Sequence, residues 1–261
     1  MNAAINTPPS VREDLQLAAL LGLAAALATA ALFPYLLEIM PDLRAKVHIA
    51  MPLLVLLQSL QAAVLLTLLS FAGLRMGPRA NLHAPWLRAL LARQPLPRIS
   101  WSLSLLAGLA AGVAVIALAQ LTDPYLPAPL HPHAATPVAS AWKGLLASFY
   151  GGIGEELQLR LFLMTLLVWT GAKLSGKTPK SVLYWFAILL AALLFGAGHL
   201  PAATAVWPMT GMVVFRTVLL NAVAGVVFGW LYWRRGLEAA MLGHFSADLV
   251  LHVAAPLLSG A

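Results

Sequence analysis

Long apolar runs recur along the whole chain, and most of the charged residues are collected in the connections between them. Seven of these runs hold about 20 mostly apolar residues each, the length that an α-helix needs to cross a lipid bilayer. They lie near residues 15–38, 48–74, 101–121, 142–169, 182–206, 211–233 and 237–258. The pattern predicts an all-α fold: a polytopic membrane helical bundle of about seven transmembrane helices.

The composition supports a chain that lies mostly in lipid. Of the 261 residues, 61% are hydrophobic and only 10% are charged, whereas a soluble domain carries about 25% charged residues. The net charge of +7 comes from short basic segments beside the apolar runs, which suits anionic lipid headgroups better than nucleic acid. We therefore expect membrane lipids as partners and no nucleic acid. The absence of cysteine excludes disulfides, thiolate nucleophiles and cysteine-ligated metals.

The chain shows no internal repeat and no stretch with the composition of a soluble domain. We therefore expect a single integral membrane domain over residues 1–261. The helices expected at about 15–121 carry no motif, while the region 140–258 carries the ionisable residues that fall within predicted spans. The first apolar run, from about Leu15 to Leu37, is too long for a signal-peptide core, so we expect it to remain as a span.

Basic residues are concentrated in alternate connections between the predicted spans. They are frequent between 75 and 98, between 173 and 180 and at 234–235, and they are scarce in the intervening connections. Loops rich in lysine and arginine stay on the cytoplasmic side of a membrane. We therefore expect a cytoplasmic N-terminus and an outside C-terminus, in a membrane that we expect to be a bacterial inner (cell) membrane.

Three predicted spans contain ionisable side chains well inside their apolar runs. Such groups cost several kcal/mol in a bilayer, so they usually face a cavity or a partner. The fourth span holds Glu155, Glu156 and Arg160, the fifth holds His199, and the seventh holds His244, Asp248 and His252. We expect these side chains to meet inside the bundle and to form a polar site there.

Helical spacing separates the roles of the two adjacent glutamates. Glu156 and Arg160 are four residues apart, so they share one helix face and are expected to form an internal ion pair. Glu155 points about 100° away from Glu156 around an α-helix, which leaves its carboxylate as the candidate general base. The glycines at 151, 152 and 154 are expected to let another helix or a substrate approach closely.

The histidines are expected to join this site from two other spans. His244, Asp248 and His252 repeat every four residues and form one stripe, in which Asp248 is expected to orient the ring of His244. We expect His252 to lie nearer the outer end, at the interface. In the fifth span Pro201 is expected to break the helix. If the membrane span continues beyond this break, His199 lies deeper in the membrane.

Three short motifs in this order resemble the signature of the CPBP intramembrane proteases. They are Glu155-Glu156-x-x-x-Arg160, Phe195-x-x-x-His199 and His244-x-x-x-Asp248. That family includes the CAAX prenyl endopeptidases and the bacterial Abi-type proteins, and the resemblance identifies residues 140–258 as a CPBP-like catalytic core. It implies that Glu155 activates water and that His199 and His244 bind the water or stabilise the oxyanion. Glu156 and Arg160 would be structural support.

The resemblance leaves the cofactor open. The family often has asparagine at the last motif position, and the charged Asp248 makes an orienting or metal-binding role there more attractive. A metal-free glutamate mechanism and a zinc metalloprotease are both compatible with the sequence. The candidate metal ligands are Glu155, His199, His244 and Asp248.

The resemblance implies an intramembrane endopeptidase that hydrolyses a peptide bond in a membrane-embedded or lipid-anchored peptide or protein substrate. The chain lacks the His-Glu-x-x-His of zinc site-2-type proteases and the Gly-x-Ser-Gly of rhomboid-type proteases. A non-catalytic scaffold or immunity membrane protein of the same family is the main alternative. A proton-coupled transporter that uses the same polar residues as a relay is a second alternative.

Overall fold

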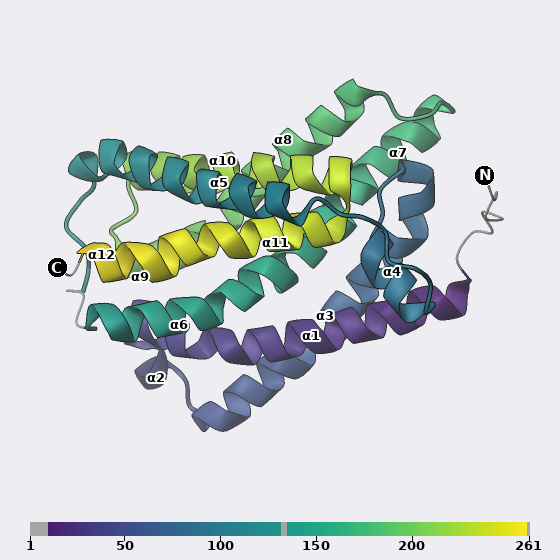
Figure 1. Ribbon diagram of the computed structural model, residues 1–261. Helices are drawn as coiled ribbons and strands as arrows, with labels where there is room; N and C mark the ends of the chain where they lie inside the picture. The colour runs from purple at the N-terminus through teal and green to yellow at the C-terminus, as the bar shows by residue number, and fades with distance from the viewer. Residues whose placement is uncertain (1–9, 132–134, 260–261) are drawn as a thin grey trace.

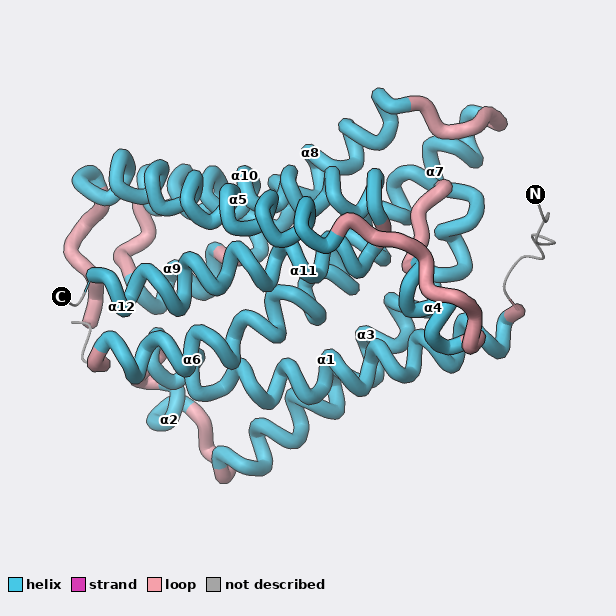
Figure 2. The backbone as a smooth tube through the Cα atoms, in the orientation of Figure 1, coloured by secondary structure: helices cyan, strands magenta, loops and turns pink. Residues whose placement is uncertain are grey.

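The computed structural model describes residues 10–131 and 135–259, and within these ranges it is built from helices without any strand (Figures 1 and 2). The helices of the first half are α1 (Val11–Ile39), α2 (Leu43–Lys46), α3 (Met51–Ala80), α4 (Pro85–Leu91), α5 (Trp101–Thr122) and the 3-10 helix η1 (Asp123–Tyr125). The fourth span joins α6 (Pro137–Phe149), η2 (Tyr150–Glu155), η3 (Leu157–Met164) and α7 (Thr165–Ser175). The remaining helices are α8 (Ser181–Gly198), α9 (Leu200–Val206), α10 (Gly211–Arg235), α11 (Leu237–Asp248), η4 (Leu249–Ala254) and α12 (Ala255–Ser259).

Within the described residues, seven helical segments are long and apolar enough to cross a membrane. They are Val11–Ile39, Met51–Ala80, Trp101–Tyr125, Pro137–Ser175, Ser181–Val206, Gly211–Arg235 and Leu237–Leu258. Each one coincides with a predicted span, so the all-α membrane bundle is confirmed. The start of α1 and the end of α12 lie at opposite ends of the bundle (Figure 1), as an odd number of crossings requires.

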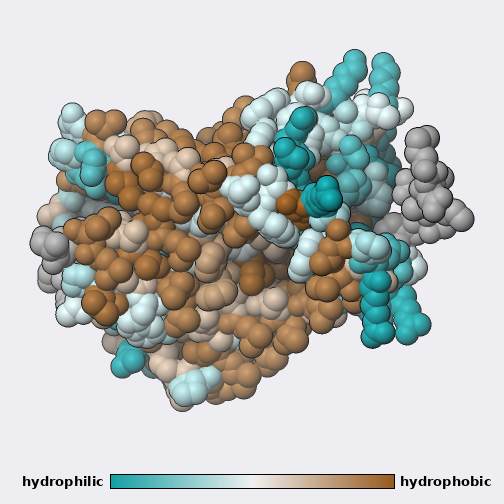
Figure 3. Space-filling view, viewed as in Figure 1, coloured by the Kyte–Doolittle hydropathy of each residue, from teal (hydrophilic) through white to brown (hydrophobic). Residues whose placement is uncertain are grey.

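The outer surface has the character of a membrane protein. Brown, hydrophobic side chains cover a broad band of the visible face, and the teal, hydrophilic groups gather toward its two ends (Figure 3). Many large apolar side chains are exposed, among them Leu27, Leu68 and Leu106 at 67%, 62% and 62%. Exposure on this scale would be costly in water, so it indicates contact with lipid.

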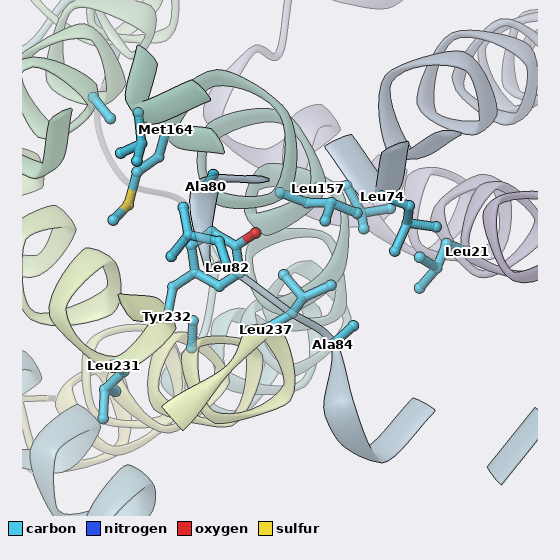
Figure 4. Close-up of a cluster of buried hydrophobic side chains, with 14 of the residues drawn as sticks. Leu21, Leu74, Ala80, Leu82, Ala84, Leu157, Met164, Leu231, Tyr232 and Leu237 are labelled. Carbon is cyan, nitrogen blue, oxygen red and sulfur yellow. The ribbon is translucent and has the colours of Figure 1, made fainter. Parts of the chain in front are cut away.

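The helices pack closely because small residues stand at their crossings. A methyl group on Gly108 of α5 would collide with the backbone oxygen of Gly243 in α11, and one on Gly22 of α1 would collide with Thr67 of α3. A large cluster of buried apolar residues fills the remaining space, and Leu157 of η3 lies beside Leu74 of α3 within it (Figure 4). The core therefore connects the first helices with the region that carries the motifs.

A buried ion cluster ties the start of α1 to α3 and α4. Asp14 is fully buried and lies 2.9 Å from Nη1 of Arg75 and 2.6 Å from Nη1 of Arg88. Ser10 and Glu13 form a capping box at the start of α1. These contacts fix the position of α1, which also lines the functional cavity.

The spans that carry the polar residues depart from regular α-helix. Most of 150–164 in the fourth span and Leu249–Ala254 in the seventh span are π-helical, a conformation that is rare and often found at functional sites. The fifth span is interrupted at His199, between α8 and α9, with Pro201 in the first turn of α9. The predicted break is therefore present, and it begins two residues before the proline.

Candidate active site

The two adjacent glutamates of the fourth span face different surroundings. The side chain of Glu156 is fully buried, whereas that of Glu155 is 19% exposed and lines a cavity. Because Glu155 ends η2 and Glu156 stands between the two π-helical segments, the turn there is wider than the assumed α-helix. The two carboxylates nevertheless point in different directions, as the sequence predicted: Glu155 lines the cavity and Glu156 is buried in the packing.

Arg160 is buried and is held on all sides. Its Nη1 donates to Oε1 of Glu156 at 2.9 Å, and its Nη2 donates to the backbone oxygen of Gly225 at 3.0 Å. The guanidinium also lies over the rings of Phe195 and Phe228, at 5.1 and 5.4 Å from their centres. The predicted ion pair is present, and the added hydrogen bond and aromatic faces explain how a charge is tolerated at this depth.

Glu156 also holds the ring of His244. Oε1 of Glu156 accepts from Nδ1 of His244 at 2.8 Å, and it is the same oxygen that accepts from Arg160. The ring is stacked on Phe228, with 4.3 Å between the ring centres. Because this contact holds a proton on Nδ1, Nε2 is the ring nitrogen that remains for interactions in the cavity.

The orienting role predicted for Asp248 therefore falls to Glu156. The nearest oxygen of Asp248 lies 3.8 Å from Nε2 of His244, which is too long for a hydrogen bond. Helical spacing places Asp248 and His244 on one face of the seventh span. The hydrogen bond to the His244 ring nevertheless comes from Glu156 in the fourth span. Asp248 is buried and lines the cavity beside the ring.

His199 enters the site from the interruption of the fifth span. Its Nδ1 lies 2.9 Å from the backbone oxygen of Phe195, and this oxygen can only accept, so Nδ1 carries the proton. Nε2 of His199 lies 3.7 Å from Oε1 of Glu155, and Nε2 of His244 lies 3.5 Å from Oε2 of Glu155. Two imidazole nitrogens thus converge on one carboxylate.

The predicted role of the glycines is confirmed for two of the three positions. A Cβ on Gly151 would collide with Oδ2 of Asp248 and would lie 3.1 Å from Nε2 of His244. A Cβ on Gly152 would lie 3.2 Å from the backbone oxygen of Met241. The glycines allow the seventh span to approach η2, and this approach brings the glutamates and His244 together.

The polar cluster opens into a cavity with a volume of about 810 Å³. Helices α1, α5, α8, α9, α10 and α11 all contribute to its walls, together with η2, η3 and η4. Much of the lining is apolar, including Leu32, Val115, Leu194 and Leu220. A polar centre in an apolar cavity is the ordinary form of a small-molecule or peptide site.

His252, expected near the outer end of the seventh span, also lines this cavity. Its ring meets Tyr35 edge-on at 5.3 Å between centres, and its Nε2 lies 4.0 Å from Asp248. Tyr35 and Tyr150 also line the cavity, and the sequence pointed to neither of them. A tyrosine within an apolar run carries no signal that separates a cavity wall from ordinary packing.

The candidate metal ligands do not form a metal site. Over the part of the chain that the structure describes, no group of three or more histidine, aspartate or glutamate side chains is arranged so that it could hold a metal ion. The nitrogens of His199 and His244 approach opposite oxygens of Glu155.

Comparison with known proteins gives one family match. Residues 137–250 match the family model described as type II CAAX prenyl endopeptidase, Rce1-like. No curated protein and no solved structure matches the chain significantly. The matched segment contains Glu155, His199 and His244 together with the supporting Glu156 and Arg160. The match supports an assignment of residues 137–250 to the CPBP/CAAX protease family.

Proposed function

We propose that this membrane protein is an intramembrane endopeptidase in which Glu155 activates the water that attacks a peptide bond. The observation that carries the proposal is the convergence of Nε2 of His199 and Nε2 of His244 on the Glu155 carboxylate, at 3.7 and 3.5 Å. Polar atoms at these separations are too far apart for a good direct hydrogen bond, and a water molecule placed beside them could bond to both. A water in this position would have a base and two imidazoles within reach.

The protonation of the two rings suits the proposed chemistry. Both Nδ1 atoms face acceptors, the Phe195 carbonyl and the Glu156 carboxylate, so each neutral ring presents an unprotonated Nε2 toward Glu155. A ring that takes up a proton there becomes a donor. It can then stabilise a negatively charged oxygen, as an oxyanion hole does.

The hydrolysis can be written as four proton and bond changes. Glu155 takes a proton from the water, and the resulting hydroxide forms a bond to the carbonyl carbon of the substrate. The carbonyl oxygen becomes an oxyanion beside the imidazole of His199 or His244, which stabilises it when Nε2 carries a proton taken from solvent before the attack. When the carbon–nitrogen bond breaks, Glu155 returns its proton to the leaving amine. Asp248 borders His244 and is proposed to position the reacting groups.

The cavity walls indicate a substrate that is itself in or at the membrane. Apolar side chains from α1, α5, α8 and α10 surround the polar cluster, and the molecule carries a hydrophobic band outside (Figure 3). We propose a membrane-embedded or lipid-anchored peptide or protein as the substrate. The apolar part of such a substrate would pass from lipid into an apolar cavity, so van der Waals packing would hold it there.

The decisive experiment compares the purified chain with Glu155→Gln in a peptide-library cleavage assay in detergent. We expect Glu155→Gln to lower cleavage at least about a hundredfold, since general-base catalysis contributes about 10² to 10⁴. Glu13→Gln is the matched control, because Glu13 is exposed in a capping box where glutamine serves equally well. If Glu155→Gln cleaves peptides at the wild-type rate, the proposed mechanism is wrong.

The same preparations separate the alternatives. A folded wild-type protein that cleaves nothing would support a non-catalytic scaffold of the family. A solute flux in vesicles that disappears in Glu155→Gln, without any proteolysis, would support a proton-coupled transporter.

A further inference from the structure

A second pocket opens at the end of the bundle where α3 and α10 finish. It has a volume of about 320 Å³ and is lined by two arginines, two tryptophans and an asparagine: Asn81, Trp230, Trp233, Arg234 and Arg235. None of these residues lines the active-site cavity. The pocket is therefore a separate feature, with a wall that is both basic and aromatic.

Contacts between three helices fix the walls of this pocket. The Tyr184 hydroxyl of α8 donates to the backbone oxygen of Ala80 at the end of α3, at 2.8 Å. The backbone N–H of Leu237, just after α10, donates to the backbone oxygen of His83 at 3.0 Å. Trp233 stacks on Tyr184, with 4.8 Å between the ring centres. The pocket is therefore formed by the packing of α3, α8 and α10 and is present before any ligand binds.

The two arginines of the pocket carry charge that the chain does not neutralise. Within residues 10–131 and 135–259, neither Arg234 nor Arg235 forms an ion pair or a side-chain hydrogen bond, and both side chains are exposed. Arg234 lies over the ring of Trp233 at 5.2 Å. Glu238, the next acid along the chain, is buried, accepts from the Leu87 N–H at 2.8 Å and does not line the pocket. Both guanidinium groups are therefore available to an external anion.

The helix ends at the pocket do not cancel this charge. Each C-terminus contributes about half a negative charge, so the ends of α3 and α10 together oppose about one of the two positive charges. Hydrogen bonds also engage carbonyls of both last turns. The Gly77 oxygen accepts from the Leu82 N–H, and the Tyr232 oxygen accepts from the Gly236 N–H, each at 3.0 Å. The pocket therefore keeps a net attraction for anions.

The surface beside the pocket is suited to the apolar part of a lipid. Trp185 of α8 meets Trp233 edge-on, with 6.0 Å between the ring centres. Trp185, Leu189 and Leu193 follow one another at intervals of four residues, so they share one face of α8, and they are 41%, 51% and 52% exposed. Tryptophan is enriched at the level of the lipid headgroups. A ligand with an anionic head and apolar chains would use both surfaces, whereas a soluble phosphate would use only the pocket.

We propose that this pocket binds the phosphate of an anionic phospholipid, whose acyl chains lie along α8. Guanidinium groups match the geometry of a phosphate, and basic pockets between transmembrane helices are a known form of site for anionic headgroups. The Asn81 amide oxygen lies 3.1 Å from Nε2 of His83, which leaves the amide NH₂ group for the headgroup. A choline headgroup carries its own cation, which Arg234 and Arg235 would repel.

The test measures lipid binding to the full chain in a neutral maltoside detergent. A fluorescent phosphatidylglycerol is displaced by dioctanoyl phosphatidylglycerol, by dioctanoyl phosphatidylcholine or by glycerol 3-phosphate. We expect the wild type to bind phosphatidylglycerol at least about tenfold more tightly than phosphatidylcholine, because each arginine adds a several-fold attraction to an anionic lipid. Equal affinities for the two lipids would overturn the proposal. If glycerol 3-phosphate competes as well as phosphatidylglycerol, the ligand is a soluble phosphate and the lipid assignment is wrong.

Arg234→Gln/Arg235→Gln is expected to bring the ratio of the two lipid affinities close to one. The matched control is Arg93→Gln/Arg98→Gln, which removes the same charge from two exposed arginines in the connection between α4 and α5, at the same end of the bundle (Figure 1). These arginines do not line the pocket, so the control is expected to keep the wild-type ratio. Thermal unfolding without added lipid checks that both double variants are folded.

Two outcomes of this comparison contradict the proposed site. If Arg234→Gln/Arg235→Gln keeps the preference for phosphatidylglycerol, the lipid binds elsewhere. If both double variants lose the preference equally, the attraction belongs to the whole basic end of the molecule and not to the pocket.

Ionic strength and a catalytic variant complete the test. Between 0.01 and 1 M salt the screening length falls from about 30 to about 3 Å, so the wild-type ratio should fall toward that of Arg234→Gln/Arg235→Gln. A ratio that salt leaves unchanged would show that charge does not select the lipid, which contradicts the proposal. Glu155→Gln is expected to keep the wild-type lipid preference, because Glu155 does not line this pocket. Failure of the lipid site would therefore leave the proposed proteolysis untouched, and the reverse also holds.

Discussion

At the scale of single residues, Glu156 is the residue on which the site depends. One of its oxygens accepts from Arg160 at 2.9 Å and from His244 at 2.8 Å. The first contact follows from a spacing of four residues along one helix, so the sequence predicted it. The second joins positions 88 residues apart, and local spacing instead favoured Asp248 as the partner of His244.

We expect Arg160→Met to destabilise the protein by about 3–5 kcal/mol, because it leaves the buried Glu156 carboxylate without its cation. Thermal unfolding in detergent checks this value. The double variant Glu156→Gln/Arg160→Met should lose less stability than the sum of its single variants, since the two residues contact each other. If Arg160→Met leaves the unfolding temperature unchanged, the Glu156–Arg160 pair does not stabilise the fold.

At the scale of elements, the site depends on how closely η2 and the seventh span approach each other. Gly151 and Gly152 face Asp248, Met241 and Phe245 across this contact. The glycines were visible in the sequence as a surface for close packing. The sequence did not show which helix packs against them, because any of the other spans could in principle meet a glycine face.

We expect Gly151→Ala to reduce cleavage at least about tenfold, because its methyl group would displace Asp248 or His244 and small misplacements of reacting groups are costly. The substitution should also lower stability by about 1–3 kcal/mol through overpacking. Gly211→Ala is the matched control, because a Cβ there meets nothing within 4 Å. If both variants cleave at the wild-type rate, the close approach has no catalytic importance.

At the scale of the whole molecule, the motif-free first half forms part of the wall of the candidate active site. Helix α1 lines the cavity with Leu32 and Tyr35 and is fixed at its start by Asp14. Helix α5 contributes Val115 to the cavity and packs on α11 at Gly108. The catalytic core predicted at 140–258 therefore obtains part of its cavity from helices outside it.

The orientation of the chain is tested most directly by cysteine labelling, because the chain has no cysteine of its own. Leu130 is 50% exposed in the connection after α5, and Ser175 is exposed at the end of α7, toward the opposite end of the bundle (Figure 1). With a cytoplasmic N-terminus, a membrane-impermeant maleimide should label Leu130→Cys in intact cells. It should label Ser175→Cys only after permeabilisation, and the cysteine-free parent controls for background. Labelling with the two positions exchanged would reverse the predicted orientation.

The sequence by itself determined the membrane bundle and the residue types of the site. Spans of about 20 apolar residues can only be satisfied as helices in lipid, and ionisable residues inside them are costly enough to be conspicuous. The Glu156–Arg160 pair followed from the same local periodicity. All of these inferences depend on residues that are near one another along the chain.

The tertiary structure alone decided which side chains of different helices meet. It placed His244 against Glu156, brought His252 into the cavity with Tyr35, and put Arg216 in the wall of the same cavity. It also introduced the π-helical turns around Glu155, which no α-helical periodicity anticipates. These features depend on the rotation and crossing of helices distant in sequence. Such packing is set by side-chain fit and close contacts, which the apolar pattern does not encode.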